Sequence, residues 1–384
     1  MPEVEEKVQE QVEAPVKKKS KKKGKKAGII VLCCIVVLAV ASALFIHFTT
    51  LPKQDMDENM IPVGGMVVSD TYDYQTESGN GIRHNPIIRI MQMVWRFCAS
   101  GDAAKHAVQT PPENVVEFTY LPYVEDDNIY HRLDVYYPNG TKPGDELPVI
   151  IDIHGGGWMY GDKNLNEYYC LALASRGYVV FNISYRLVPD VTVNEQLQDC
   201  ALALQWISQH FEDYPCNPNN IMLTGDSAGG MLAVYSAVLL QSPELRETFD
   251  VVDGNMNISA LLLTSPVAFM KDGGAFSVYT KPMWGSDYDD KPTANYMDLD
   301  SIISFAQLPP TYLITSDGDS LAHEQTHRAY DLLIENGVDA KLADYEMLCG
   351  KKQPHVFSVL NPFDEAGTTA ITSALGFYKS VIDE

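Results

Sequence analysis

The chain has 384 residues, enough for one large α/β domain with appendages, and 46% of them are apolar, which supplies a sizeable core. Nine lysines and five glutamates give residues 1–26 a charge of +4. Since the whole chain has a formal net charge of −23, the other 358 residues carry −27. Phosphate backbones repel so acidic a body, and we expect no nucleic-acid partner. The seven cysteines contain no C-x-x-C pair and indicate no disulfide framework, although one bridge, such as Cys200 with Cys216, stays open.

The N-terminal part combines a lysine-rich tail with an apolar run. Eight of the ten residues 17–26 are lysine, and residues 27–48 carry no formal charge. At about 1.5 Å per residue this run reaches about 33 Å, which matches a hydrocarbon core of about 30 Å. We predict a transmembrane helix over 27–48, with residues 1–26 cytoplasmic and the remainder outside the cell membrane. The alternative is a signal peptide cleaved near Ala43, behind the small residues 41–43, which would release a secreted protein.

Three further segments precede or interrupt the main alternation of elements. Residues 49–85 are polar and contain glycine without a sustained period, so we interpret them as a tether. Residues 86–98 have apolar positions on all but a narrow stripe, which predicts a helix that needs cover on most sides. We expect the folded domain to span 86–384. Two stretches are candidates for a lid, residues 86–110 and the polar insertion 267–308.

From residue 115 the chain alternates strand-like and helix-like segments, which predicts a mostly parallel sheet covered by helices on both faces. We expect strands at 115–123, 132–137, 149–153, 178–184, 221–224, 260–263, 311–315 and 341–345. We expect helices at 166–175, 194–211, 231–240, 323–336 and 363–382. We find no internal repeat, and no low-complexity stretch other than the lysine run.

A candidate nucleophile lies between a predicted strand and a predicted helix. The segment Gly225-Asp226-Ser227-Ala228-Gly229 fits G-x-S-x-G, which alone is a weak signal. Here an apolar strand precedes Ser227 and an apolar helix follows it, and small neighbours permit the strained turn that exposes a serine hydroxyl. The context therefore predicts Ser227 as a nucleophile.

A glycine run about 70 residues upstream has a matching chemical use. His154-Gly155-Gly156-Gly157 follows another buried strand, and three consecutive glycines cost backbone entropy that a plain strand end has no reason to bear. Backbone N–H groups free of side chains can bind the negative charge that develops on an attacked carbonyl oxygen. We expect Gly156, Gly157 and Ala228 to donate these N–H groups, and His154 to fix the loop.

Three motifs together resemble those of the hormone-sensitive-lipase-like esterases, which have the α/β-hydrolase fold. Residues 154–158 (His-Gly-Gly-Gly-Trp) look like the family's oxyanion motif, and 225–230 (Gly-Asp-Ser-Ala-Gly-Gly) like its nucleophile elbow. Residues 185–190 (Tyr-Arg-Leu-Val-Pro-Asp) are similar to the family's Tyr-Arg-Leu-Ala-Pro-Glu. The resemblance covers about 115–384 and implies an α/β-hydrolase whose triad follows the chain order Ser, Asp, His.

That order implies an acid after the strand at 311–315, where two aspartates stand, Asp317 and Asp319. The family pattern Asp-Pro-Leu-x-x-Glu overlays Asp319 best, with Ser320 in place of proline. We therefore expect Asp319 to be the triad acid.

The base is implied to follow the last strand in a loop, and His355 fits that position. His355 is followed by Val356 where the family has glycine, and the loop before it is longer than usual. His323 and His327 are one helical turn apart after the acid, and we expect them to face solvent.

The resemblance implies a carboxylic-ester hydrolase that forms an acyl-enzyme on Ser227, with a small-molecule ester or acylated polysaccharide carrying short acyl groups as substrate. Two alternatives stay open: an amidase, formamidase or peptidase with the same triad, and a surface-binding protein without catalysis. We expect no metal, no cluster of His and Asp with metal-ligand spacing, and no nucleotide cofactor, since a G-x-G-x-x-G after the first strand is missing.

Overall fold

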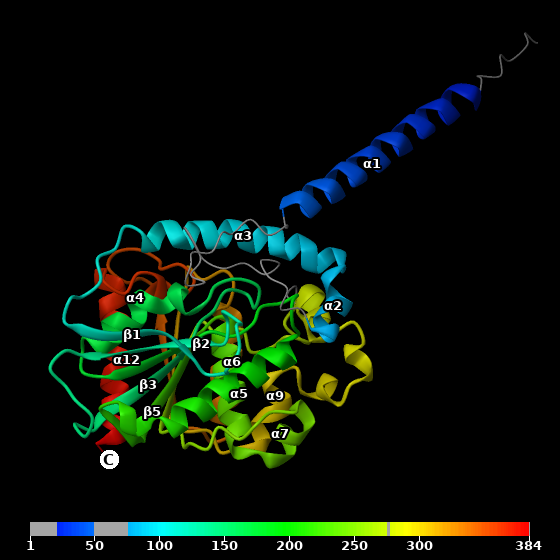
Figure 1. Cartoon of the computed structure of the whole chain (residues 1–384). Helices are drawn as coiled ribbons and strands as arrows, with labels where there is room; N and C mark the ends of the chain where they lie inside the picture. Colours follow the sequence, from blue (N-terminus) through cyan, green and yellow to red (C-terminus); the bar gives the residue numbers. More distant parts are fainter. Residues whose placement is uncertain (1–20, 50–75, 275–276, 384) are drawn as a thin grey trace, which may run out of the picture. The chain divides into compact units, whose positions relative to one another are not determined.

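The computed structural model describes residues 21–49, 76–274 and 277–383, which fall into two separate units, Met1–Thr49 and Thr50–Glu384 (Figure 1). The first unit contains one helix, α1 (Lys21–Thr49). Its window Gly28–Phe45 is long and apolar enough to cross a membrane or to serve as a signal sequence. The apolar part of the predicted 27–48 helix is thus helical, and most of the predicted cytoplasmic tail lies outside the described residues.

The second unit is built on an eight-stranded sheet with the order β1-β2-β4-β3-β5-β6-β7-β8. The β1–β2 and β2–β4 pairs are antiparallel, and every other neighbouring pair is parallel. The predicted mostly parallel sheet is therefore confirmed, as part of an α/β-hydrolase fold. The strands are β1 (Val115–Pro122), β2 (Arg132–Pro138), β3 (Leu147–Ile153), β4 (Val179–Ile183), β5 (Cys216–Asp226), β6 (Ala260–Thr264), β7 (Thr311–Ser316) and β8 (Ala340–Tyr345).

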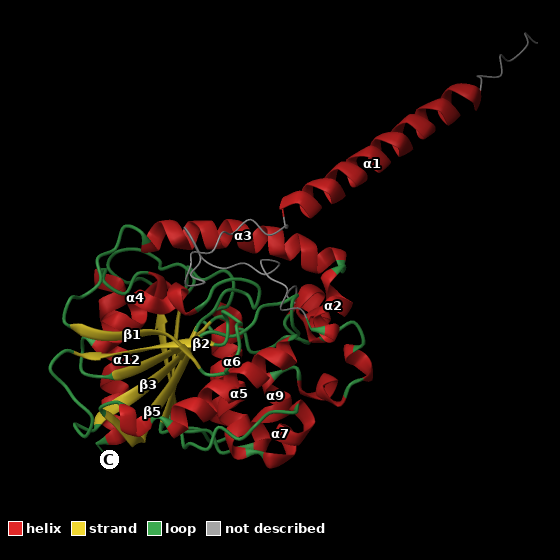
Figure 2. Cartoon of the chain, viewed as in Figure 1, coloured by secondary structure: helices red, strands yellow, loops and turns green. Residues whose placement is uncertain are grey.

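Helices cover both faces of this sheet, because alternate residues of the central strands point to opposite sides (Figure 2). On β3, Val149 and Ile151 belong to the core shared with α5 (Val193–Gln209) and α6 (Ala228–Gln241), whereas Ile150 belongs to the core shared with α4 (Lys163–Ala174) and α12 (Glu365–Ile382). The helices of this layer structure are α4 (Lys163–Ala174), α5 (Val193–Gln209), α6 (Ala228–Gln241), α7 (Pro243–Phe249), α10 (His323–Glu335), α11 (Phe357–Leu360) and α12 (Glu365–Ile382).

Smaller elements fill the connections. A 3-10 turn, η1 (Phe211–Asp213), follows α5. The insertion predicted at 267–308 forms α8 (Ser277–Thr280), η3 (Lys281–Trp284), η4 (Tyr288–Asp290), η5 (Pro292–Tyr296), α9 (Leu299–Ile302) and η6 (Ile303–Phe305). Cys200 and Cys216 are buried free thiols, so the disulfide that the sequence left open does not form between them.

The predicted tether is wrong for its last ten residues. Thr76 caps a short helix, α2 (Glu77–Arg83), by accepting a hydrogen bond from the Gly79 N–H at 3.0 Å. The Thr76 N–H donates to the carbonyl oxygen of Asp190 at 2.9 Å, and the side chain of Ile82 is buried in the main core. The cap at Thr76 and the buried side chain of Ile82 therefore attach this segment to the main domain, although its composition is polar.

The helix predicted at 86–98 is confirmed and continues to His106 as α3 (Pro86–His106). The part of the chain that the structure describes covers less of it than its apolar composition predicted: it buries a narrow face that includes Ile88 and Gln92, whereas Ile90 and Phe97 are exposed. The buried face thus includes Gln92, a residue of the polar stripe, and apolar residues take the solvent side.

Candidate active site

The predicted nucleophile sits in the sharp turn between β5 and α6. Ser227 adopts φ 51° and ψ −115°, a left-handed backbone that is strained for a residue with a side chain. Its N–H donates to the carbonyl oxygen of Thr264 at 2.9 Å, and its own carbonyl oxygen accepts from the N–H of Val267 at 3.1 Å. Contacts with the end of β6 therefore hold the turn that presents the hydroxyl.

The structure brings Ser227, His355 and Asp319 into one hydrogen-bonded chain. His355 Nε2 lies 2.9 Å from Ser227 Oγ, and His355 Nδ1 lies 2.9 and 3.0 Å from the two carboxylate oxygens of Asp319. Asp317 takes no part in this chain, because its carboxylate pairs with Lys352 Nζ at 3.0 Å on the surface. The geometry therefore favours Asp319 over Asp317 as the partner of the imidazole.

The surroundings of Asp319 favour the ionised form of its carboxyl group. Burial alone would raise the pKa of its carboxyl, but the hydrogen bond and positive charge of His355 outweigh burial, helped by the Ser265 side chain and the Ala322 N–H, and the pKa is lowered. The Leu321 and Ala322 N–H groups donate to Oδ1 at 3.0 and 2.9 Å. The two residues that directly precede α10 thus hold the Asp319 carboxylate in place beside the His355 ring.

The loop that carries His355 contains one departure from the family pattern, a valine where the family has glycine. Val356, which stands where the family has glycine, adopts φ 47°, in the left-handed region that favours glycine. The preceding loop is tied to the end of β7 by a hydrogen bond from the Ser316 hydroxyl to the carbonyl oxygen of Gln353. Valine therefore occupies a glycine-type backbone position, and buried packing holds its side chain in place.

The predicted oxyanion donors lie on two adjacent segments. The loop after β3 carries Gly156 and Gly157, with φ 97° and 57°, and α6 begins at Ala228 next to it, since Ile153 of β3 pairs with Gly225 of β5. Within the described ranges, no group accepts a hydrogen bond from the N–H of Gly156 or Gly157. These two N–H groups are therefore available to a substrate oxygen.

His154 has a structural role in this loop. Its ring stacks on Tyr185 with centroids 4.3 Å apart, and the Tyr185 hydroxyl donates to the carbonyl oxygens of His154 and Gly155 at 2.8 and 3.0 Å. Complete burial lowers the pKa of His154 to about 3, so the ring stays neutral. Tyr185 is the first residue of the 185–190 motif, which thus braces the oxyanion loop.

A buried polar cluster behind the nucleophile was not predicted. Asp226 Oδ1 accepts hydrogen bonds from the Gly155 N–H at 3.0 Å and from Asn166 Nδ2 at 2.8 Å. Asn166 Nδ2 also donates to Asp152 Oδ2 at 2.8 Å. Burial raises the pKa of Asp226 to about 6, although Asn166, the charge of His355 and the Gly155 N–H each lower it in part. The cluster links the nucleophile turn to the glycine loop.

Trp95 of α3 is a second residue that the sequence did not single out. A Cβ atom added to Gly157 would lie 2.5 Å from the Trp95 ring, so the indole rests directly on the predicted oxyanion loop. The ring also stacks on Tyr160, with centroids 5.8 Å apart. The sequence predicted a helix here, but no local signal indicates which of its residues meets a loop 60 positions away.

The expectation that no His and Asp cluster has metal-ligand spacing is wrong. Residues 323–327 read His-Glu-Gln-Thr-His, which fits H-E-x-x-H. In the structure the ligand atoms of His323, His327 and Asp344 lie within 4.8 Å of one another. The two histidines are partly exposed, as predicted, but they face a common carboxylate.

Comparison with known proteins places the chain in a family. Residues 133–271 match the family model BD-FAE. The chain is 30% identical to the crystal structure of esterase B from Lactobacillus rhamnosis, with a TM-score of 0.71, over 77% of this chain and 95% of that one. The chain belongs to the hormone-sensitive-lipase-like esterases. They are carboxylic-ester hydrolases of the α/β-hydrolase fold, as the motifs predicted.

Two further comparisons have lower identity. This esterase is 26% identical to the "Probable carboxylic ester hydrolase LipM" of Mycobacterium tuberculosis over 304 residues, 76% of this chain, and spans 66% of that protein's length. A bacterial heroin esterase, 22% identical with a TM-score of 0.58 over 74% of this chain and 90% of that one, shares the fold.

Proposed function

We propose that this esterase cleaves carboxylic esters through an acyl-enzyme on Ser227. The observation that carries the proposal is the continuous hydrogen-bonded chain from Ser227 Oγ through His355 to Asp319, with both links at 2.9 Å. A serine hydroxyl is a weak nucleophile unless a base accepts its proton, and this chain supplies an oriented base.

Each step uses a group already in position. His355 Nε2 accepts the Ser227 proton as Oγ attacks the carbonyl carbon, while Asp319 holds the ring in the tautomer with Nε2 unprotonated. The N–H groups of Gly156, Gly157 and Ala228 bind the oxyanion. His355 then returns the proton to the departing alcohol oxygen. In the second half of the reaction Nε2 takes a proton from water as the water oxygen attacks the acyl carbon, and it passes this proton to Ser227 Oγ as the acid leaves.

We assign short acyl groups to the substrate, which is a small-molecule ester or an acylated polysaccharide. The Trp95 ring lies against the loop at Gly157, where an added Cβ would meet it at 2.5 Å, and we expect it to limit the length of the acyl chain. The relative esterase B has been crystallised with a tributyrin phosphonate inhibitor, whose chains are short, and it is 30% identical to this esterase.

We also propose that α1 anchors the enzyme in the cell membrane, with the lysine-rich tail cytoplasmic and the catalytic domain outside. The support is the apolar window Gly28–Phe45, which is fully exposed within its own unit. Such a helix is stabilised by lipid rather than by protein contacts. Because α2 packs on the main core, we place the start of the catalytic domain at Thr76 rather than at residue 86.

Hydrolysis of p-nitrophenyl esters from acetate to laurate tests the proposal. We expect kcat/KM to be highest for acetate or butyrate and to fall toward laurate, and Ser227→Ala to abolish hydrolysis of all of them. Ser380→Ala, on the outer side of α12, is the matched control and should behave as wild type. If a folded wild-type protein hydrolyses amides but no ester, the amidase alternative is favoured instead.

A further inference from the structure

The two histidines of the H-E-x-x-H segment and one aspartate converge on the side of α10 that faces β8. His323 and His327 are four residues apart, so their side chains lie on the same side of the helix. His323 Nε2 lies 3.1 Å and His327 Nε2 2.7 Å from the same oxygen, Oδ2 of Asp344 on β8. Three ligand atoms from two elements thus meet at one point.

We propose that His323, His327 and Asp344 bind a divalent transition metal ion of the zinc class. A tetrahedral Zn²⁺ ion with bonds of about 2.0–2.2 Å keeps its ligand atoms roughly 3.4 Å apart. To reach this spacing, the two nitrogen-to-oxygen distances, 2.7 and 3.1 Å, need to open by roughly 0.7 and 0.3 Å, which side-chain rotation can supply. Water completes the coordination, and the site does not depend on the ester chemistry proposed above.

The donor set decides the class of ion. Two imidazole nitrogens with one carboxylate oxygen suit zinc and its neighbours, whereas calcium and magnesium prefer oxygen ligands alone. The carboxylate of Asp317 lies 3.9 Å from His323 Nε2, but it is paired with Lys352 Nζ at 3.0 Å, so the choice of ion rests on the two imidazoles and Asp344.

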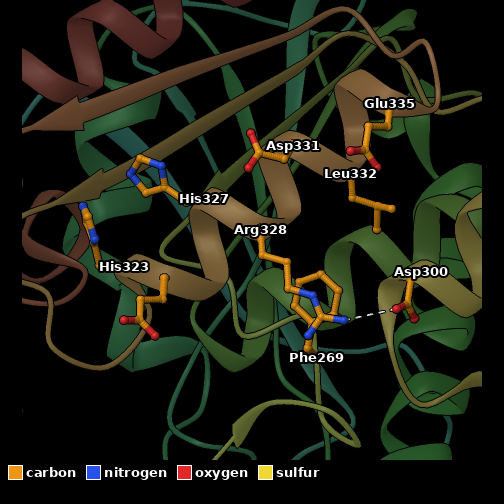
Figure 3. Close-up of a pocket in the computed structure, with 9 residues that line it drawn as sticks. Phe269, Asp300, His323, His327, Arg328, Asp331, Leu332 and Glu335 are labelled. Carbon is orange, nitrogen blue, oxygen red and sulfur yellow. Dashed lines mark hydrogen bonds and ion pairs between the residues drawn. The ribbon is translucent and has the colours of Figure 1, made fainter.

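Access from solvent is open. The side chains of His323, His327 and Asp344 are 29%, 40% and 28% exposed. Both histidines line a surface pocket of about 570 Å³. Figure 3 shows that Arg328 of the same helix turns toward Phe269 and Asp300 instead. An ion can thus reach the histidines without any rearrangement of the fold.

The location would let a bound ion stabilise the turn that carries Asp319. The His323 N–H donates to the carbonyl oxygen of Asp319 at 3.3 Å, so α10 begins directly at the turn that carries the triad acid. Asp344 lies on β8 opposite Thr315, near the end of β7 that leads into this turn. A bound ion would tie α10 to β8 across the turn and hold it more firmly.

Cobalt is the direct probe of this site, because four-coordinate Co²⁺ absorbs visible light and Co²⁺ in water absorbs only weakly. We expect the full-length, tag-free chain in detergent, stripped of metal by chelation, to develop this absorption with one Co²⁺ per chain and to lose it when Zn²⁺ is added. We expect Zn²⁺ at 100 times its Kd to raise Tm by roughly 5 °C.

The variants His327→Ala and Asp344→Asn each remove one ligand from a different element. Both are expected to lose the absorption and the Zn²⁺-dependent rise in Tm, with Zn²⁺ affinity reduced at least about 100-fold. His84→Ala, which removes an exposed histidine after α2, is the matched control and should bind as wild type. The proposal is overturned if wild type gives no absorption and no Tm rise, or if both ligand variants bind as tightly as wild type.

Discussion

Asp317 and Asp319 lie two residues apart on one turn, yet their surroundings differ completely. Asp319 is buried and receives two backbone N–H groups and the His355 ring, whereas Asp317 is exposed and pairs with Lys352. The difference arises because the turn before α10 points one side chain inward and the other outward. The two residues therefore provide a matched pair for testing the acid.

Asp319→Asn should lower kcat by about 10⁴-fold, because an amide cannot hold His355 in the tautomer that leaves Nε2 free to accept a proton. Asp317→Asn should change kcat less than about fivefold, since an exposed ion pair is worth at most about 1 kcal/mol. Steady-state kinetics on p-nitrophenyl butyrate compares the two. Equal losses in both variants would contradict the assignment of Asp319.

Asp226 makes stability depend on pH. Burial raises its folded pKa from 3.8 to about 6, so the folded state binds this proton more tightly than the unfolded state. The stabilisation from the protonated carboxyl is complete below about pH 4 and is lost as pH rises through about 6. Asp226→Asn carries no such proton, and its free energy of unfolding relative to wild type should rise by up to roughly 3 kcal/mol between about pH 4 and pH 8. Parallel curves for the two proteins in denaturant titrations would show that Asp226 does not titrate in this range.

At the scale of elements, α3 meets the predicted oxyanion loop through the Trp95 ring. Gly157→Ala places a methyl group against the Trp95 ring, and kcat/KM for p-nitrophenyl acetate should fall at least about tenfold. Trp95→Ala removes the obstacle, so the double variant should recover part of the loss, with a coupling energy of about 1–3 kcal/mol.

The control for this cycle is Gly177→Ala, a glycine that also has positive φ but meets no atom within 4 Å of an added Cβ. It should combine additively with Trp95→Ala. Additive behaviour of Gly157→Ala with Trp95→Ala would mean that α3 does not cover the oxyanion loop in solution.

Elements with a strong local signal were predictable, and contacts between distant elements were not. The run 149–153, apolar except for Asp152, and the glycines after it indicated β3 and its loop, because a buried parallel strand is largely apolar on both faces. Trp95 and the Asp226–Asn166–Asp152 cluster depend on side chains that meet only after folding. The exposed apolar side of α3 was also missed, since composition does not reveal which face of a helix is covered.

The whole molecule combines an acidic catalytic domain with an apolar helix at its N-terminal end. If α1 is a membrane anchor, the mature protein should retain it and partition into the detergent phase, because no protein contact buries its apolar residues Gly28–Phe45 within its unit. Ala43→Tyr, which blocks a small-x-small cleavage site, should then leave the mass of the mature protein unchanged except for the substitution. A mature wild-type protein that begins at Leu44 would instead identify a cleaved signal peptide.

The central claim is that Ser227 attacks the ester, and covalent labelling tests it most directly. A phosphonate with butyl-sized chains should add once to the wild-type protein, and peptide mass spectrometry should locate the adduct on Ser227. Ser227→Ala, with an unchanged Tm, should take up no label and hydrolyse no ester. Labelling at any other residue, or wild-type rates of hydrolysis by folded Ser227→Ala, would contradict the account.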